Sequence, residues 1–330
     1  MEPGHARRDS EQTQPHHHDP KRRLMPSQPR SAVREGAWSW WALLKRTVSE
    51  FRADNVTDWA AALTYYGVLS IFPALIALAS VVGLLGSSAT SSLLDNLRAF
   101  TPGPAKDILT NAVTGLSKSR SASGILFVAG LALALWSASG YVAAFMRAAN
   151  AIWDAPEGRP IWKTVPVRLG ITIVTVVILA AGAVAVVVTG PVAQRAGDLL
   201  GLGGAAVSAW EIAKWPALVL LFGLLLSILY YAAPNVIHPG FRWVTPGGVL
   251  AIVLWIAASA AFAFYVAAFS SYNKTYGSLG GVVVFLIWLW VSNIAILLGA
   301  EFDAELARER AIAAGAPADK EPFLRLRNEP

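Results

Sequence analysis

Six long stretches of the chain are almost free of charged side chains, and more polar stretches separate them. A helix needs about 20 mainly apolar residues to cross the hydrocarbon core of a bilayer. The stretches of this kind are Trp59–Leu85, Gly124–Met146, Val167–Thr189, Pro216–Ala232, Thr245–Phe269 and Ser278–Ala300. In hydrocarbon, a helix satisfies all of its backbone polar groups within one segment. The pattern therefore predicts an all-α polytopic membrane protein, a bundle of six transmembrane helices.

The polar stretches predict the rest of the organisation. Residues 1–36 have too little apolar surface to fold alone, so we expect a disordered cytoplasmic tail. Residues 37–314 make up the transmembrane domain, which includes an amphipathic outer loop at 87–123. The last helix is expected to continue past its span to about Ala314, where stop signals follow. Residues 315–330 are predicted to be a flexible cytoplasmic tail.

Apolar residues recur at helical spacing just before the first span, at Trp38, Trp41, Leu44, Val48 and Phe51. Tryptophans and cations on an amphipathic helix suit the headgroup layer of a membrane. The alternative is a helix that packs on the cytoplasmic side of the protein itself. The sequence leaves both interpretations open.

Charge supports the membrane assignment and orients the helices. Only 15% of the residues are charged, against about 25% in a typical soluble domain. Six spans put both termini on one side, and 20 of the 27 Lys and Arg residues lie at that end of the spans. Because cytoplasmic loops are rich in Lys and Arg, the count predicts that both termini are cytoplasmic. The same bias explains the net charge of +6 without nucleic acid; membrane lipids are the expected partners.

The sequence offers little for catalysis. It has no cysteine, which excludes disulfides and thiol chemistry. Three adjacent histidines, His16, His17 and His18, lie in the predicted tail and are expected to be incidental. There is no convincing nucleophile–base pair or His/Asp cluster. We therefore expect no enzymatic activity, no metal and no cofactor.

Polar side chains inside membrane helices are costly and often functional. In the first span, Tyr66, Ser70 and Pro73 share one helical face. Pro73 removes a backbone hydrogen bond and so favours a kink. This face either packs structurally within the bundle or lines a path through it.

Two later spans carry polar stripes. Trp136 and Arg147 lie on one stripe of the second span, with Ser139 beside it, while Asn293 and Glu301 lie on one stripe of the last span. Both helices are predicted to run from outside to inside, so Arg147 and Glu301 reach similar depth. One hypothesis is that these two residues face the bundle and pair. The alternative is that both mark helix ends at the headgroups.

Three glycines, Gly277, Gly280 and Gly281, open the last span. Small residues let membrane helices approach closely, and a hinge is the alternative. Further along the same helix, Glu305 and Arg308 are spaced to form an ion pair on its surface.

Short motifs lie within the spans and at their ends. They are Ala61–Tyr66 (AALTYY), Ser70–Pro73 (SIFP), Trp136–Ser139 (WSAS), Asn150–Trp153 (NAIW), Arg159-Pro160, Pro234-Asn235, Pro246-Gly247, Tyr276–Gly280 (YGSLG) and Gly299–Glu301 (GAE). Their order and spacing from Trp38 to Leu306 resemble the YihY/BrkB family of bacterial inner-membrane proteins. Asn293 lies outside the family pattern.

The resemblance implies six transmembrane helices in the bacterial inner membrane with both ends cytoplasmic. The family's activity is poorly defined; proposals include transport or export of lipid-like or amphiphilic molecules and a part in resistance to host defences. Its old label, ribonuclease BN, is not supported by these residues. Metal-dependent RNA hydrolysis needs clustered His and Asp ligands, and His238 is the only histidine outside the N-terminal tail.

We therefore expect a transporter or flippase-like exporter of a lipid-like or amphiphilic molecule. No ATP-binding P-loop is present, so transport would use an ion gradient or be passive. The alternative is a membrane scaffold that organises envelope enzymes without transporting anything; it would need only the packing glycines and the surface helices.

Overall fold

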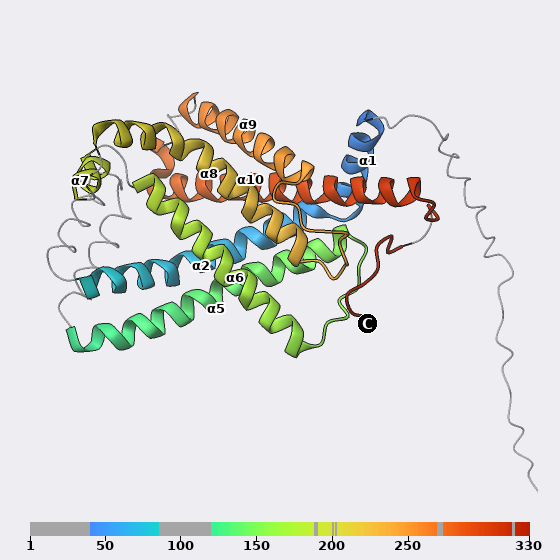
Figure 1. Cartoon of the computed structure of the whole chain (residues 1–330), viewed down its shortest axis with the longest axis horizontal. Coiled ribbons are helices and arrows are strands. Elements are labelled where there is room, and N and C mark those ends of the chain that lie inside the picture. The colour runs from blue at the N-terminus through green and yellow to red at the C-terminus, as the bar shows by residue number, and fades with distance from the viewer. Residues whose placement is uncertain are drawn as a thin grey trace, which may run out of the picture. The chain divides into compact units, whose positions relative to one another are not determined.

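The computed structural model describes residues 40–85, 120–187, 191–199, 201, 203–268, 273–318 and 321–330 (Figure 1). The chain divides into two units, Met1–Ser39 and Trp40–Pro330, and the description below concerns the second. In these ranges the protein is all-helical, as predicted. The helices are α1 (Trp40–Ala53), α2 (Val56–Leu85), α5 (Arg120–Ile152), α6 (Ile161–Val187), α7 (Pro191–Leu199), α8 (Gly204–Ala232), α9 (Pro246–Ala268) and α10 (Asn273–Ala313).

The predicted spans fall in α2, α5, α6, α8, α9 and α10. Within the described residues, four segments are long and apolar enough to cross a membrane: Ile161–Gly182, Gly204–Ala232, Pro246–Tyr265 and Gly280–Ala313. Helices α2 and α5 are 30 and 33 residues long. The fourth span begins earlier than predicted, because α8 continues through Pro216. A membrane helix tolerates a proline when its neighbours satisfy the freed backbone groups. The predicted outer loop, 87–123, lies mostly outside the described residues.

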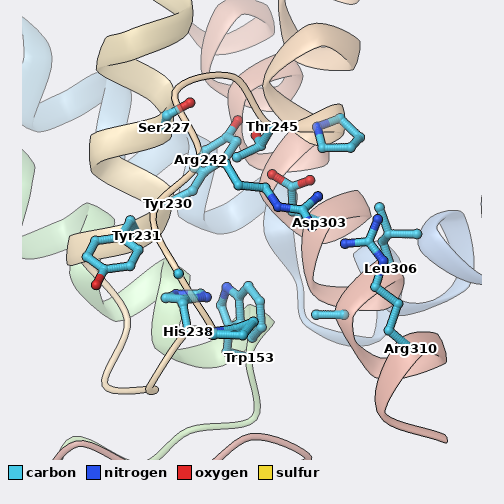
Figure 2. A pocket seen from close by; sticks show the side chains of 14 residues that line it. Trp153, Ser227, Tyr230, Tyr231, His238, Arg242, Thr245, Asp303, Leu306 and Arg310 are labelled. Carbon is cyan, nitrogen blue, oxygen red and sulfur yellow. The ribbon is translucent and has the colours of Figure 1, made fainter. Parts of the chain in front are cut away.

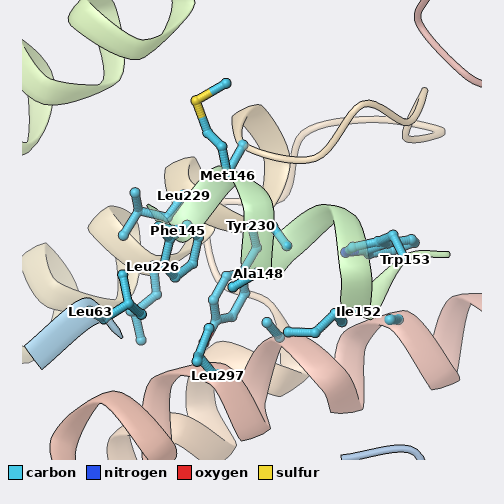
Figure 3. Packing of buried hydrophobic residues seen from close by; sticks show 14 of the residues in the cluster. Leu63, Phe145, Met146, Ala148, Ile152, Trp153, Leu226, Leu229, Tyr230 and Leu297 are labelled. Atoms are coloured by element: carbon cyan, nitrogen blue, oxygen red, sulfur yellow. The ribbon is translucent and has the colours of Figure 1, made fainter. Parts of the chain in front are cut away.

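The buried core lies where four of the helices meet. Leu63 of α2, Phe145 of α5, Leu226 of α8 and Leu297 of α10 are fully buried in one cluster (Figure 3). The ring of Phe145 stacks on Tyr230, with 6.4 Å between the ring centroids. Figure 1 also shows α2 and α5 running side by side, in agreement with their extensive contact. Large apolar side chains thus hold together segments far apart in the sequence.

Helix α1 packs on the rest of the protein, which is one of the two interpretations that the sequence left open. Leu43 packs against Phe302 and Leu306 of α10. Its other side exposes Trp41, which is 76% accessible, and Val48. The helix therefore packs on the protein through one face and presents tryptophan and valine on the other.

The last helix continues well past its predicted span and ends at Ala313, as expected. Gly315 follows with a φ of +96°, a left-handed conformation that suits glycine at a helix C-terminus. Its backbone N–H donates to the Ile312 carbonyl at 2.9 Å.

The flexible tail predicted for 315–330 is not what the structure shows at residues 321–330. The backbone of this segment hydrogen-bonds to the loop after α8: Ile237 N–H donates to Arg325 O at 2.8 Å, and Arg327 N–H donates to Asn235 O at 3.0 Å. Phe323 packs on Trp153, with 5.6 Å between ring centroids. Leu324 and Leu326 also pack against the main core cluster. The segment is short, but it gains order from these apolar contacts and from pairing with backbone groups that the loop leaves free.

The closest helix approach occurs at glycines other than those predicted. A Cβ on Gly299 of α10 would lie 2.4 Å from the Gly247 carbonyl oxygen of α9, and a Cβ on Gly247 would lie 2.0 Å from the Gly299 carbonyl oxygen. By contrast, a Cβ on Gly281 would meet no atom within 4 Å. Gly280 is half-buried, and the surroundings of Gly277 lie outside the described residues. Among the described glycines of α10, the close approach is thus at Gly299, in the second half of the helix.

Gly299→Ala should lower the thermal unfolding temperature of the detergent-purified protein, because its methyl group has no room beside the α9 backbone. Overpacking a buried site costs about 1–3 kcal/mol. Gly281→Ala is the matched control on the same helix and should leave the temperature unlowered. Equal melting of wild type and Gly299→Ala would show that the close approach is not needed.

Candidate functional site

Among the described residues, helix α10 carries five of the 14 buried polar or charged side chains, more than any other helix. It contacts α1, α2, α5 and α9. Asn293 and Glu301 are each 1% exposed, and Glu305 and Arg308 are also buried. Burying such groups is expensive unless each finds a partner. Their partners therefore distinguish structural groups from candidate functional ones.

Asn293 joins three helices through satisfied hydrogen bonds. The Tyr141 hydroxyl of α5 donates to Asn293 Oδ1 at 2.9 Å. Asn293 Nδ2 donates to Thr64 Oγ1 of α2 at 3.1 Å, and Thr64 donates in turn to the Ala60 carbonyl at 2.8 Å. This network fixes the relative positions of α2, α5 and α10.

The polar face of the first span also packs structurally where it is described. The Tyr66 ring lies over Gly140 of α5, where an added Cβ would sit 3.1 Å from it. The Ser70 hydroxyl donates to the Tyr66 carbonyl at 2.8 Å. Helix α2 continues through Pro73 to Leu85, but the Pro73 side chain lies outside the described residues.

The residues singled out in the second span do not share one environment. Ser139 is buried and donates to the Trp136 carbonyl at 2.7 Å. Trp136 is exposed, with the Arg168 guanidinium 5.7 Å from its ring centroid. Arg147 is exposed, whereas Glu301 is buried. The structure does not bring Arg147 and Glu301 together, because the Arg147 side chain is exposed whereas Glu301 lies in the interior.

Glu301 instead lies among other acids. Its Oε2 atom is buried and has no hydrogen-bond partner among the described residues. The charged groups that act on it most strongly are carboxyls from three parts of the chain: Asp54, Glu305, Glu50 and Asp154. We call these five residues, together with Glu321, the acidic cluster. A buried carboxyl with carboxyl neighbours favours the protonated form.

Two arginines partly neutralise the acidic cluster. Arg46 Nε of α1 lies 2.6 Å from Glu305 Oε2. Arg308 lies 3.9 Å from Glu305 and 3.6 Å from Glu321. The predicted pair of Glu305 and Arg308 is confirmed, but both side chains are 5% exposed rather than on the surface. These ion pairs fix α1 and segment 321–330 on α10, and neither arginine forms an ion pair with Glu301 in the described ranges.

At the edge of this cluster, burial and the carboxyl of Asp154 raise the pKa of Asp54 to about 7. Burial and the Glu321 carboxylate also raise the pKa of Asp154. Asp54 lies in the turn between α1 and α2, and Asp154 lies just after α5. The cluster is thus built from chain segments that meet at one end of the helices.

A second polar network occupies the same end. Asn150 Oδ1 accepts a hydrogen bond from the Asn235 backbone N–H at 2.7 Å. Asn235 Nδ2 donates to the carbonyls of Pro156 at 2.9 Å and Asn328 at 2.8 Å. Arg159 donates to the Ala233 carbonyl at 2.9 Å. Sequence reasoning found the motifs that contain Asn150, Arg159 and Asn235 but gave these residues no role. The available signal was that Asn150 lies in the last turn of α5, whereas Arg159 and Asn235 lie beside prolines in the segments that follow α5 and α8.

Beside this network lies a cavity of about 90 Å³ between the loop after α8 and the end of α10 (Figure 2). Its lining includes His238, Arg242, Thr245, Asp303 and Arg310. Sequence reasoning did not single out a cavity here, because its lining comes from segments distant in the chain. Figure 2 shows Asp303 close to the side chain of Arg242.

Asp303 has a structural role in the wall of the cavity. Its Oδ1 atom accepts a hydrogen bond from the Gly247 backbone N–H at 2.7 Å. Thr245 Oγ1 accepts one from the Gly248 N–H at 2.9 Å. Together they satisfy free N–H groups in the first turn of α9.

Burial and the nearby Arg327 cation lower the pKa of His238 to about 4. The imidazole is therefore neutral near pH 7, and it lies edge-on to Trp153 with ring centroids 4.7 Å apart. The positive charge of the cavity thus comes from Arg242 and Arg310.

The long apolar helices and their buried polar ends define a multi-pass helical membrane protein. The sequence model of the family described as virulence factor BrkB matches residues 47–322. The chain belongs to this family, as its motifs indicate.

Three relatives illustrate the relationship. YfkH of Bacillus subtilis (strain 168), whose name describes it as ribonuclease-like, is 31% identical over 82% of this chain and 96% of its own length. A UPF0761 membrane protein of Alkalilimnicola ehrlichii is 32% identical over 81% of this chain. Another, from Azoarcus sp. (strain BH72), is 29% identical over 78% of this chain. The chain spans 60% and 61% of the length of these last two relatives. No solved structure matches the chain.

Asp54→Asn should flatten the pH dependence of stability. The folded-state pKa of Asp54, about 7, lies above its ordinary value of 3.8. The folded protein therefore binds this proton more tightly, and Asp54 makes stability fall as the pH rises from about 4 to about 7. Melting temperatures of detergent-purified protein across this window would measure the slope. Asp58→Asn, at an exposed position, should keep the wild-type slope; an unchanged slope in Asp54→Asn would contradict the prediction.

Proposed function

We propose that this protein is a transporter that moves a lipid-like or amphiphilic molecule across or between the leaflets of a membrane. The observation that carries the proposal is Glu301, a buried carboxyl without an ion-pair partner in the described ranges, on the helix that contacts four others. Ionisable groups buried in membrane helices are costly and are typical of substrate paths and proton relays. Packing alone gives no reason for such a group.

Glu301 also gives the protein a means of coupling to an ion gradient. Uptake of a proton removes a charge surrounded by Asp54, Glu305 and other carboxyls, so protonation changes the repulsion between α10 and the α1–α2 turn. A group of this kind lets a proton gradient favour one arrangement of the helices over another. The absence of a P-loop from the sequence is in keeping with this source of energy.

Glu301→Gln keeps the size and hydrogen-bonding capacity of the side chain but removes its ionisation. We expect it to reduce movement of fluorescent phospholipids between leaflets at least tenfold in proteoliposomes with an imposed pH gradient. Dithionite quenching measures this movement. Glu309→Gln, two turns further along α10 at a partly exposed position, is the matched control and should retain activity.

Wild-type protein that moves none of a broad set of lipids and amphiphiles, with or without a gradient, would contradict the transport proposal. Stable co-purification of envelope enzymes in that case would favour the scaffold. We expect no hydrolysis of RNA by the purified protein in either case.

We also infer six spans, α2, α5, α6, α8, α9 and α10, in the bacterial inner membrane with both ends in the cytoplasm. Contacts at one end of the helices support an even number of crossings. They join the segment before α2 with the end of α10, the turn after α5 with the loop after α8, and that loop with segment 321–330. The excess of Lys and Arg at this end supports its cytoplasmic location.

The absence of natural cysteines allows a direct test of this topology. Leu199 of α7 is 88% exposed, and Gly240 lies in the loop after α8 with no atom within 4 Å of an added Cβ. A membrane-impermeant maleimide added to spheroplasts should label Leu199→Cys and leave Gly240→Cys unlabelled until the cells are lysed. The reverse pattern would invert the orientation, and equal labelling would contradict the assignment of α8 as a span.

A further inference from the structure

The cavity beside Asp303 has an excess of positive charge that its own residues do not neutralise. Arg242 comes from the loop after α8 and Arg310 from the last turn of α10, and both line the cavity. Both lie near enough to Asp303 to act on its charge. Neither forms an ion pair in the part of the chain that the structure describes. Asp303 is meanwhile engaged by the α9 backbone. The cavity is thus lined by two guanidinium groups and one carboxylate, and the unbalanced positive charge favours binding of an anion.

The other groups around the cavity fit this interpretation. His238 is uncharged near pH 7 because burial and Arg327 oppose its protonation and lower its pKa to about 4. The Ser227 hydroxyl donates a hydrogen bond to the Trp243 carbonyl oxygen, and the Tyr230 hydroxyl donates one to the Ile296 carbonyl oxygen. The guanidiniums of Arg242 and Arg310 are thus the cationic donors that line the cavity, and planar guanidinium groups bind phosphate oxygens through paired hydrogen bonds.

Size and surroundings limit the ligand further. A cavity of about 90 Å³ has room for several water molecules, which is enough for one phosphate group. Beside it the loop exposes the apolar side chains of Ile237, Trp243, which is 72% accessible, and Val244. Tryptophan and arginine side by side at the end of a membrane helix are typical of the lipid headgroup layer.

We propose that this cavity binds the phosphate of a phospholipid headgroup, held between Arg242 and Arg310, while the lipid tail lies outside along Trp243 and Val244. The site is distinct from Glu301 and requires no transport. The inference goes beyond the proposed function, and binding measured at equilibrium tests it without any assay of lipid movement.

The experiment titrates the full chain, purified in an uncharged detergent, with dioctanoyl phosphatidylglycerol and follows binding by native mass spectrometry. Two control ligands separate the parts of the site: dioctanoylglycerol lacks the phosphate, and inorganic phosphate lacks the tail. We expect the phospholipid to bind at least tenfold more tightly than either. Arg242→Gln and Arg310→Gln should each weaken phospholipid binding about tenfold, the typical effect of losing a hydrogen bond to a charged group.

Three further variants keep the result interpretable. Arg325→Gln removes an exposed arginine outside the cavity lining and should leave the affinity unchanged. Arg310→Lys keeps the charge and should retain more binding than Arg310→Gln, which separates loss of the site from loss of folding. Trp243→Ser should weaken phospholipid binding without changing any weak binding of inorganic phosphate.

Equal affinity for dioctanoylglycerol and the phospholipid would overturn the proposal, as would an equal loss in Arg325→Gln. Inorganic phosphate that binds as tightly as the phospholipid and displaces it would also overturn it, since the site would then be one for free phosphate.

Discussion

The contact between α9 and α10 is the constraint on which the polar end of this protein depends. At Gly247 and Gly299 the two backbones lie too close together for any side chain. Close to this contact, Asp303 accepts a hydrogen bond from the Gly247 N–H in the first turn of α9. The contact thus fixes the start of α9, which is where the loop after α8 ends. The loop in turn carries Asn235 into the network with Asn150 and Asn328, and Arg242 to the cavity. Loss of the close approach would displace the network, the loop and the cavity together.

The buried polar groups of α10 differ in how completely they are satisfied, and this separates structure from candidate function. Asn293 has a partner on α2 and another on α5, so it acts as a connector. Glu305 and Arg308 are paired, and they bind α1 and segment 321–330 to the helix. Glu301 lies between Asn293 and the ion-paired Glu305 without an ion pair of its own in the described ranges, and its buried Oε2 atom has no hydrogen-bond partner there. A protein stabilised only by packing has no use for such a group, because an apolar residue of similar volume would serve at lower cost.

The hydrophobic pattern predicted the helical class, the approximate positions of the long helices and the extension of α10, because the cost of exposing polar groups to lipid is a local property of the sequence. The pattern could not say which residues of α5 face its neighbours, so the hypothesis of an Arg147–Glu301 pair failed: Arg147 is exposed and Glu301 is buried. The sequence indicated close helix packing at the start of α10, because three glycines lie close together there. The close contact instead involves Gly247 and Gly299, which lie 52 positions apart in the sequence. The order of residues 321–330 and the existence of the cavity depend on contacts between distant segments, which no local signal reveals.

The hydrogen bonds of Asn235 have a consequence for the order of assembly. Its partners Asn150 and Asn328 lie 85 residues before it and 93 residues after it. Asn150 and Asn235 are therefore synthesised well before Asn328. A chain that stops before residue 321 would leave the Asn235 side chain with one of its two carbonyl acceptors, that of Pro156. Residues 321–330 thus complete a network whose other members come earlier in the chain.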